Sequence, residues 1–297
     1  NSIKKEKEEK QSTEALTFHS DSEMRLKLNN FEHSLPLYDN PQIPYDYLSE
    51  IFYSLVADQQ INQPYFTNIS NQPQINEKIR LVLVDWLYNV TEQFKLKMET
   101  LHLTVNLIDR YMSVKVIEKP YFQLLGVCSL WLAAKFEEIY YPEIRDLIYI
   151  CDKAYSKSEI MSMEYDLLET LEFSILSVTP YKMLEVLLML FSLSEYEINF
   201  CRLIFEVVLY DMRCTQFDPK TILFSAIYVV KKAIKSDMSN FNNLLNMMNL
   251  TLEVLHTCTM RLCHLLDNFE NQCFQKIRAK YLKKQYSEVA RFAFLNN

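Results

Sequence analysis

The stretch PYFQLLGVCSLWLAAKFEE, from Pro120 to Glu138, is apolar at nearly every position between Phe122 and Ala134. A helix that is hydrophobic on all sides has to be buried on all sides, and ~15 residues are too few to cross a membrane. Gly126, the only glycine of the chain, falls in the middle of this helix, where glycine costs about 1 kcal/mol relative to alanine. We therefore expect the axial helix of a helical bundle, with the backbone of another helix passing close to Gly126.

The composition around this stretch predicts an all-α protein. With 297 residues, of which 49% are hydrophobic, the chain can bury a substantial core, and its length suggests two domains. One glycine and nine prolines leave little material for hairpin turns, which need glycine or asparagine at positive φ. No repeated strands of period two are visible, so helices are expected throughout.

Charge and cysteine usage narrow the classes of partner and location. The formal charge of -7 disfavours nucleic acid as a partner, because phosphate binding needs clustered Lys and Arg. The one basic run, residues 276–284, is predicted to be a solvated terminal helix. With no signal peptide and no apolar span of about 18 residues, we expect a soluble intracellular protein without a membrane partner. The cysteines form no CxxC pair and lie mostly in apolar runs, which is typical of free core thiols in a reducing compartment; they are Cys128, Cys151, Cys201, Cys214, Cys258, Cys263 and Cys273.

The helical pattern divides the chain into a tail, two tandem units of five helices each and a terminal segment. The boundaries are predicted as a flexible tail at 1–42, an N-terminal helix and linker at 43–73, a first unit at 74–178, a second at 179–270 and a terminal helix at 271–297. Thr179-Pro180 separates the units, because the residue before proline is driven out of helical conformation. Asn76, Ser156 and Ser194 are expected to cap helices. The predicted helices lie at about 76–95, 98–114, 120–137, 141–150, 156–172, 180–191, 194–211, 219–235, 241–248 and 251–269.

The helix that begins after Asn76 carries more apolar surface than a helix at the edge of a bundle needs. One stripe consists of Ile79, Val82, Leu83, Trp86 and Val90, and a second consists of Leu81, Val84, Leu87 and Tyr88. The spare stripe is either packed under the helix that follows Pro44 or exposed as a binding groove.

Neither an active site nor a metal centre is expected. The carboxylates Glu137, Glu138, Glu143 and Asp146 lie on a helix end and the following loop, but no histidine, glycine-rich phosphate loop or aspartate-rich metal motif accompanies them. The group His256, Cys258, Cys263 and His264 spreads around one helix instead of converging on a single point. We therefore expect no catalytic residue, no metal and no cofactor.

Lys135 and Glu164 are unusual because each interrupts an otherwise apolar helical face. An uncompensated charge on such a face is costly to bury. One interpretation is an internal salt bridge of Lys135 with Glu138 or with Glu164. The other is that both side chains point outward from an apolar groove and bind polar groups of a partner.

Four blocks of sequence resemble the cyclin family, specifically the A/B-type (mitotic) cyclins. They are INEKIRLVLVDWL at 75–87, ETLHLTVNLIDRYMS at 99–113, AAKFEEIYYPE at 133–143 and MEYDLLETLEFSI at 163–175. The closing KIRAKYLKKQYSEVA is similar to the end of that family's second repeat. The resemblance implies two five-helix cyclin boxes after an N-terminal helix, and a non-catalytic chain of the nucleus and cytoplasm that activates a cyclin-dependent serine/threonine kinase.

The resemblance also implies roles for individual residues. Lys135 and Glu164 match the charged pair that grips the kinase C-helix, which favours the outward interpretation, and the apolar positions that receive that helix match Leu132, Phe136, Leu168 and Ile175. The hydrophobic patch that docks Arg-x-Leu motifs of substrates and inhibitors matches Ile79, Arg80, Val82, Leu83, Trp86 and Gln123.

Several positions depart from the family pattern. Ile79 stands where the patch usually has Met, Leu81 where it has Ala, and Asn89 where an acidic residue commonly meets the cation of the motif; losing that contact should weaken docking. These departures leave room for a scaffold that keeps the cyclin fold but activates no kinase. A cyclin-fold transcription factor is a separate alternative, which the acidic net charge disfavours. In the tail, Arg25 and Leu28 have the Arg-x-x-Leu form of a destruction box, a possible degradation signal.

Overall fold

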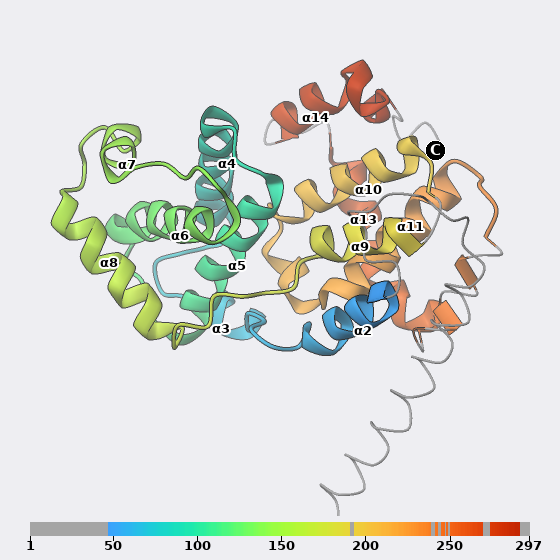
Figure 1. The fold of residues 1–297 in the computed structure, drawn as a ribbon, viewed down its shortest axis with the longest axis horizontal. Coiled ribbons are helices and arrows are strands. Elements are labelled where there is room, and N and C mark those ends of the chain that lie inside the picture. The colour runs from blue at the N-terminus through green and yellow to red at the C-terminus, as the bar shows by residue number, and fades with distance from the viewer. Residues whose placement is uncertain are drawn as a thin grey trace, which may run out of the picture.

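The computed structural model describes residues 47–190, 193–238, 241, 242, 245, 246, 248, 250–269 and 274–291. Within these segments every regular element is a helix, and the helices form two bundles side by side, as Figure 1 shows. The predicted all-α class with two tandem units is therefore confirmed. The tail at 1–42, with Arg25 and Leu28, lies outside the described residues, as does Cys273.

The N-terminal bundle contains the stretch that decides the fold. Its helices are α4 (Glu77–Phe94), α5 (Met98–Val114), α6 (Phe122–Glu137), α7 (Ile144–Ile150) and α8 (Lys157–Thr170). All positions of α6 from Leu124 to Leu130 are buried, as expected for an axial helix. The predicted caps are present, because Asn76 accepts a hydrogen bond from the Ile79 amide and Ser156 forms a capping box.

Gly126 is the point where a neighbouring helix packs closely against α6, and the atoms nearest to it belong to a side chain. A Cβ atom at Gly126 would lie 2.8 Å from Cδ1 of Leu83 on α4. The helix predicted to pass close to Gly126 is α4, but its nearest atoms belong to the Leu83 side chain and not to the backbone. The missing side chain makes room for Leu83 to pack into α6, which brings α4 and α6 together.

The C-terminal bundle repeats this plan. Its helices are α9 (Pro180–Leu190), α10 (Glu195–Val208), α11 (Pro219–Ala233) and α13 (Leu252–Asp267). The apolar α11 is buried from Thr221 to Ile227, and Ser194 forms the predicted capping box of α10. Of the helix expected at 241–248, the described residues 241, 242, 245 and 246 are helical. Four short 3-10 helices are also described: η2 (Lys119–Tyr121), η3 (Met212–Gln216), η5 (Lys284–Tyr286) and η6 (Val289–Arg291).

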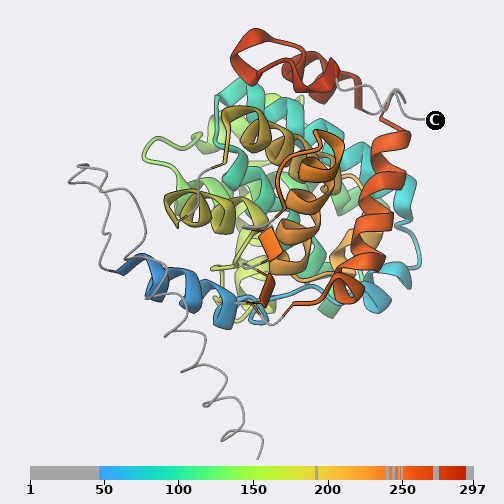
Figure 2. The same ribbon diagram turned by 90° about the vertical axis from the view of Figure 1, so that its right-hand side faces the viewer.

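The N-terminal helix α2 (Leu48–Asp58) packs against α9 of the C-terminal bundle (Figures 1 and 2). The short α3 (Phe66–Ser70), which the sequence did not predict, contacts α5. The second apolar stripe of α4 is largely buried inside the molecule, where Tyr88 donates a hydrogen bond to Glu206 of α10. Burial inside the molecule, where α4 packs against α5 and α6 and Tyr88 reaches the C-terminal bundle, thus accounts for most of this stripe, and neither predicted alternative included it.

The terminal helix α14 (Gln275–Tyr281) is anchored more firmly than its charge suggests. Lys280 Nζ lies 2.7 Å from Oε1 of Glu206, and Tyr281 donates to the same oxygen. The Lys280 side chain is only 11% exposed and Glu206 is fully buried. The prediction of a fully solvated basic helix at 276–284 was therefore wrong for Lys280.

Candidate functional site

The predicted charged pair is brought together between α6 and α8. Lys135 Nζ lies 2.6 Å from Glu164 Oε1, with 30% and 16% of the two side chains exposed. Lys135 Nζ also lies 3.2 Å from the ring centroid of Trp131, a cation–π contact. The internal salt bridge left open by the sequence is therefore formed in the isolated chain.

This ion pair leaves both groups able to bind a partner. An ammonium has three donors and a carboxylate has two acceptor oxygens. The single Lys135–Glu164 hydrogen bond uses one of each. A partner that approaches the partly exposed pair can therefore add hydrogen bonds without first breaking the bridge.

Glu138, the other predicted partner of Lys135, has a different role. Its Oε1 accepts hydrogen bonds from the Lys97 amide at 2.7 Å and from Thr100 Oγ1 at 2.5 Å, at the start of α5. Trp131 Nε1 donates to the carbonyl oxygen of Pro142 at 3.0 Å. The loop after α6 is thus fixed at both of its ends.

The predicted apolar residues around the pair differ in exposure. Phe136, beside Lys135, is 47% exposed, whereas Leu168 and Ile175 are half-buried. Leu132 is buried, so it supports the surface from below and is not accessible to a partner in the isolated chain. We call this surface the α6–α8 face.

Several exposed apolar side chains near this face were missed in the sequence. They follow the end of α6, lie on α8, or follow α8: Ile139, Tyr140, Tyr141, Met161, Tyr165, Phe173 and Leu176. Apolar surface next to charged residues often marks a protein-binding site. The available signal was the run Ile139-Tyr140-Tyr141, three large apolar residues in a segment that cannot be a helix core.

The predicted docking patch gathers on α4 and the start of α6. Val82 is 66% exposed, and Ile79, Trp86 and Gln123 are half-buried. Leu83 is buried against Gly126 and supports the surface from inside. We call the four accessible residues the α4 patch.

Arg80 does not belong to the α4 patch. Its side chain is 2% exposed, and Nε and Nη2 donate to the two carboxylate oxygens of Asp109 at 2.8 and 2.7 Å. Nη1 donates to the carbonyl oxygen of Leu209, just after α10, at 2.9 Å. Arg80 therefore joins the two bundles, because its position on α4 faces inward while the neighbouring Ile79 faces the surface.

Two carboxylates of α4, Glu77 and Asp85, already have basic partners. Glu77 pairs with Arg213 at 3.2 Å, and Asp85 lies 3.5 Å from Lys276 of α14. Asn89 donates its side-chain amide to the carbonyl oxygen of Asp85. A cationic motif at the α4 patch would have to compete for these carboxylates.

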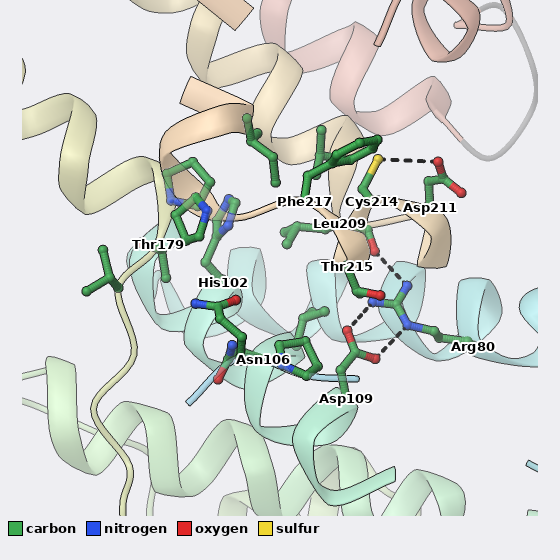
Figure 3. A pocket seen from close by; sticks show the side chains of 18 residues that line it. Arg80, His102, Asn106, Asp109, Thr179, Leu209, Asp211, Cys214, Thr215 and Phe217 are labelled. Carbon is green, nitrogen blue, oxygen red and sulfur yellow. Dashed lines mark hydrogen bonds and ion pairs between the residues drawn. The ribbon is translucent and has the colours of Figure 1, made fainter. Parts of the chain in front are cut away.

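A cavity of about 90 Å³ lies between the bundles. Figure 3 shows His102 and Asn106 of α5 on one side and Leu209, Thr215 and Phe217 of the C-terminal bundle on the other. His102 is buried, and the pKa of its imidazole is lowered to about 3, mainly by burial and further by the charge of Lys280. The imidazole is therefore neutral in the folded chain at neutral pH.

Because His102 is buried in its neutral form, we expect the free energy of unfolding to decrease as the pH falls. The unfolded chain binds a proton at His102 near pH 6.5, whereas the folded chain does not until about pH 3, so falling pH favours unfolding. The loss should reach about 2 kcal/mol by pH 5, at ~1.4 kcal/mol per pH unit. Urea unfolding at pH 7 and pH 5 should show this extra loss in the wild type and in the exposed-site control His264→Gln, but not in His102→Gln. An equal loss in all three chains would contradict the assignment.

The described residues offer few other kinds of site. No group of three or more His, Cys, Asp or Glu side chains in these segments is arranged to hold a metal ion. None of the described helices has both the length and the apolar character that a membrane span requires. The described cysteines are free, and all but Cys263 are buried.

Comparisons with known proteins identify the two bundles. Residues 50–176 match the cyclin N-terminal domain and residues 178–295 the cyclin C-terminal domain. The chain is 30% identical to a G2/mitotic-specific cyclin-B of Marthasterias glacialis, covering 88% of this chain and 67% of the relative. It is also 30% identical to a G2/mitotic-specific cyclin-B of Dictyostelium discoideum, over 91% of this chain and 63% of that relative. The chain thus spans only about two thirds of the length of these relatives.

The fold is also found in a solved structure. A viral cyclin from herpesvirus saimiri superposes with a TM-score of 0.62 at 17% identity, covering 72% of this chain and 97% of the viral protein. At this identity the likeness concerns the fold alone. The two domain matches, which together cover most of the chain, show that it belongs to the cyclin family.

Proposed function

We propose that this chain is the activating subunit of a cyclin-dependent serine/threonine kinase in cell-cycle control. The observation that carries the proposal is the α6–α8 face, where the Lys135–Glu164 pair and the exposed Phe136 combine charge with apolar surface. Membership of the cyclin family and the mitotic names of its relatives support this assignment. The chain would have no chemistry of its own and would act in the nucleus and cytoplasm.

The proposed mechanism is a shift between kinase conformations. A protein kinase transfers phosphate only when its own Lys–Glu ion pair is formed and its activation loop is ordered. The α6–α8 face would bind the kinase C-helix more tightly in its inward position than in its outward position. This difference in binding free energy would raise the population of the active kinase.

Copurification with a kinase, followed by a histone phosphorylation assay, tests this function. An activating subunit should copurify with a cyclin-dependent kinase and raise phosphorylation far above that of the kinase alone. A kinase complex without activity would indicate a scaffold instead. Absence of any kinase, with recovery of promoter DNA or polymerase, would indicate a cyclin-fold transcription factor, which the net charge of -7 disfavours.

The α4 patch is proposed to dock substrates that carry Arg-x-Leu motifs. Trp86→Ala should then lower kcat/KM of the kinase complex for a motif-bearing protein substrate by about tenfold, because an aromatic side chain that becomes buried on docking often contributes much of the binding free energy. Activity on a short peptide without the motif should stay unchanged. Val254→Ala, an exposed apolar position on α13, is the matched control. Equal loss on both substrates would indicate misfolding and contradict a docking role.

A further inference from the structure

The turn that follows α8 has an unusual backbone. Glu172 and Phe173 have φ angles of 51° and 57°, although neither is glycine. Residues with side chains rarely adopt this left-handed conformation, and they keep it only where surrounding contacts determine it. Backbone hydrogen bonds hold part of the turn from within, because the amides of Phe173 and Ser174 donate to the carbonyl oxygens of Leu168 and Leu171. Side chains from other segments supply further contacts.

Asn62, on the connection between α2 and α3, supplies the first contacts. Its side-chain amide donates to Ser174 Oγ and to the carbonyl oxygen of Leu176, both at 2.7 Å. Asn62 also has a positive φ of 63°, which asparagine tolerates better than most residues. One side chain thus binds the turn at two points.

Arg110 on α5 supplies the second set of contacts. Its Nη2 donates to the carbonyl oxygen of Ser174 at 2.7 Å and to Oδ1 of Asn62 at 3.1 Å. Arg110, Asn62 and the turn therefore form one hydrogen-bonded unit that links α5, the α2–α3 connection and the end of α8.

Arg110 is a buried cation, so the hydrogen bonds it makes in this unit have to offset the cost of burying its charge. The residue is only 7% exposed, and among the described residues its hydrogen-bond partners are neutral oxygens. Burial lowers the pKa of its guanidinium to about 10, so it stays charged at neutral pH. A buried cation without a carboxylate partner is costly. Its position is explained by the carbonyl and amide oxygens that Nη2 binds, whereas Nη1 is buried without a hydrogen-bond partner among the described residues.

The anchored turn displays apolar side chains. Phe173 and Leu176 are 65% and 52% exposed, on either side of the bound Ser174. They follow directly on α8, the helix that carries Glu164 and Leu168 of the α6–α8 face. The backbone is fixed from inside while these apolar groups face outward.

We infer that Arg110 and Asn62 form a clamp that positions the turn at 172–176 for binding the kinase; this rests on the proposed function. Both are positioning residues, because their hydrogen bonds go to the turn and leave Phe173 and Leu176 for the partner. A segment that is already ordered loses less conformational entropy on association, so affinity is higher than for a loose turn.

Two substitutions remove the clamp with little other change. Arg110→Met removes both hydrogen bonds of Nη2 but keeps a long unbranched side chain, and Asn62→Gly removes the side chain while accepting the positive φ. Lys115→Met is the matched control, because Lys115 lies at the end of α5 and pairs with Asp166 of α8 instead of the turn. Affinity for a purified cyclin-dependent kinase would be measured by calorimetry at a temperature where every variant is folded.

Each clamp variant should bind the kinase about tenfold more weakly than the wild type, with a less favourable binding entropy. Hydrogen exchange in the free chain should rise at residues 172–176 and stay unchanged in α4 and α6. Lys115→Met should match the wild type in both measurements.

Unchanged affinity in folded clamp variants would overturn the clamp and leave the kinase assignment standing. Weaker binding with exchange raised throughout the chain would also overturn it, because the residues would then be structural only. A wild-type chain that binds no kinase would overturn both proposals.

Discussion

Glu164→Ala and Lys135→Ala should each weaken kinase binding by roughly 30- to 1,000-fold, or about 2 to 4 kcal/mol. The two groups lie 2.6 Å apart in a partly buried setting. Removing one therefore deletes its contact with the kinase and leaves the other charge unpaired in the complex. Stimulation of histone phosphorylation should fall in parallel at subsaturating chain concentrations.

The double variant decides between the two interpretations of this pair. If Lys135 and Glu164 only neutralise each other, removing both should restore most of the binding that a single substitution loses. If each also meets polar groups of the kinase, the double variant should bind no better than either single variant. Wild-type activity in both single variants and in the double variant would contradict any role in kinase binding.

The pair at Lys115 and Asp166 provides a matched control. It joins α5 to α8 at 2.5 Å with similar chemistry, but its side chains are more exposed. An exposed pair contributes about 0 to 1 kcal/mol to folding stability. Lys115→Ala should therefore leave kinase binding and histone phosphorylation close to wild type, which separates a surface effect from loss of the α6–α8 face.

Local signals predicted the helices well. The apolar run in α6 and the caps Asn76, Ser156 and Ser194 all depend on residues within a few positions of one another. Such patterns report the period of burial and the ends of a helix directly. The order and approximate bounds of most helices could therefore be predicted from the sequence.

Contacts between distant segments could not be predicted in the same way. The pattern of α4 shows two apolar stripes but not which neighbour covers each one. The resemblance that places Arg80 in a surface patch likewise does not reveal that Arg80 pairs with Asp109. Conversely, the sequence pattern did not show that apolar residues near the α6–α8 face, such as Tyr140 and Phe173, are exposed. The residue pattern singled out Lys135 and Glu164 and the resemblance assigned them a role, but neither predicted the hydrogen bonds by which Arg110 holds the nearby turn.

The buried ion pair of Glu206 with Lys280 should have the largest effect on stability. Lys280→Met leaves Glu206 fully buried without its counter-charge. Breaking such a pair by removing one partner costs about 3 to 5 kcal/mol. Urea unfolding at pH 7 should show this loss, whereas Lys284→Met, an exposed position of the same basic run, should change stability by less than about 0.5 kcal/mol.

The pH dependence of the stability lost in Lys280→Met tests whether the unpaired charge of Glu206 causes that loss. Burial raises the pKa of Glu206, while Lys280 and the hydroxyls of Tyr281 and Tyr88 act against this rise. Without Lys280 the folded-state pKa should rise further above that of the unfolded chain. A raised carboxyl pKa favours the folded state at low pH and loses that benefit as pH increases. The cost of Lys280→Met should therefore shrink as the pH falls from 7 towards 5.

Tyr88→Phe separates the ion pair from the hydrogen bonds around it. The Tyr88 hydroxyl donates to Oε2 of Glu206 at 3.1 Å and links α4 to the C-terminal bundle. A hydrogen bond to a charged group contributes about 1.5 to 3 kcal/mol, so this variant should lose less stability than Lys280→Met. A Lys280→Met chain as stable as the wild type would contradict the anchoring of α14. The basic run at the end of the chain would then be the solvated surface that its charge pattern predicts.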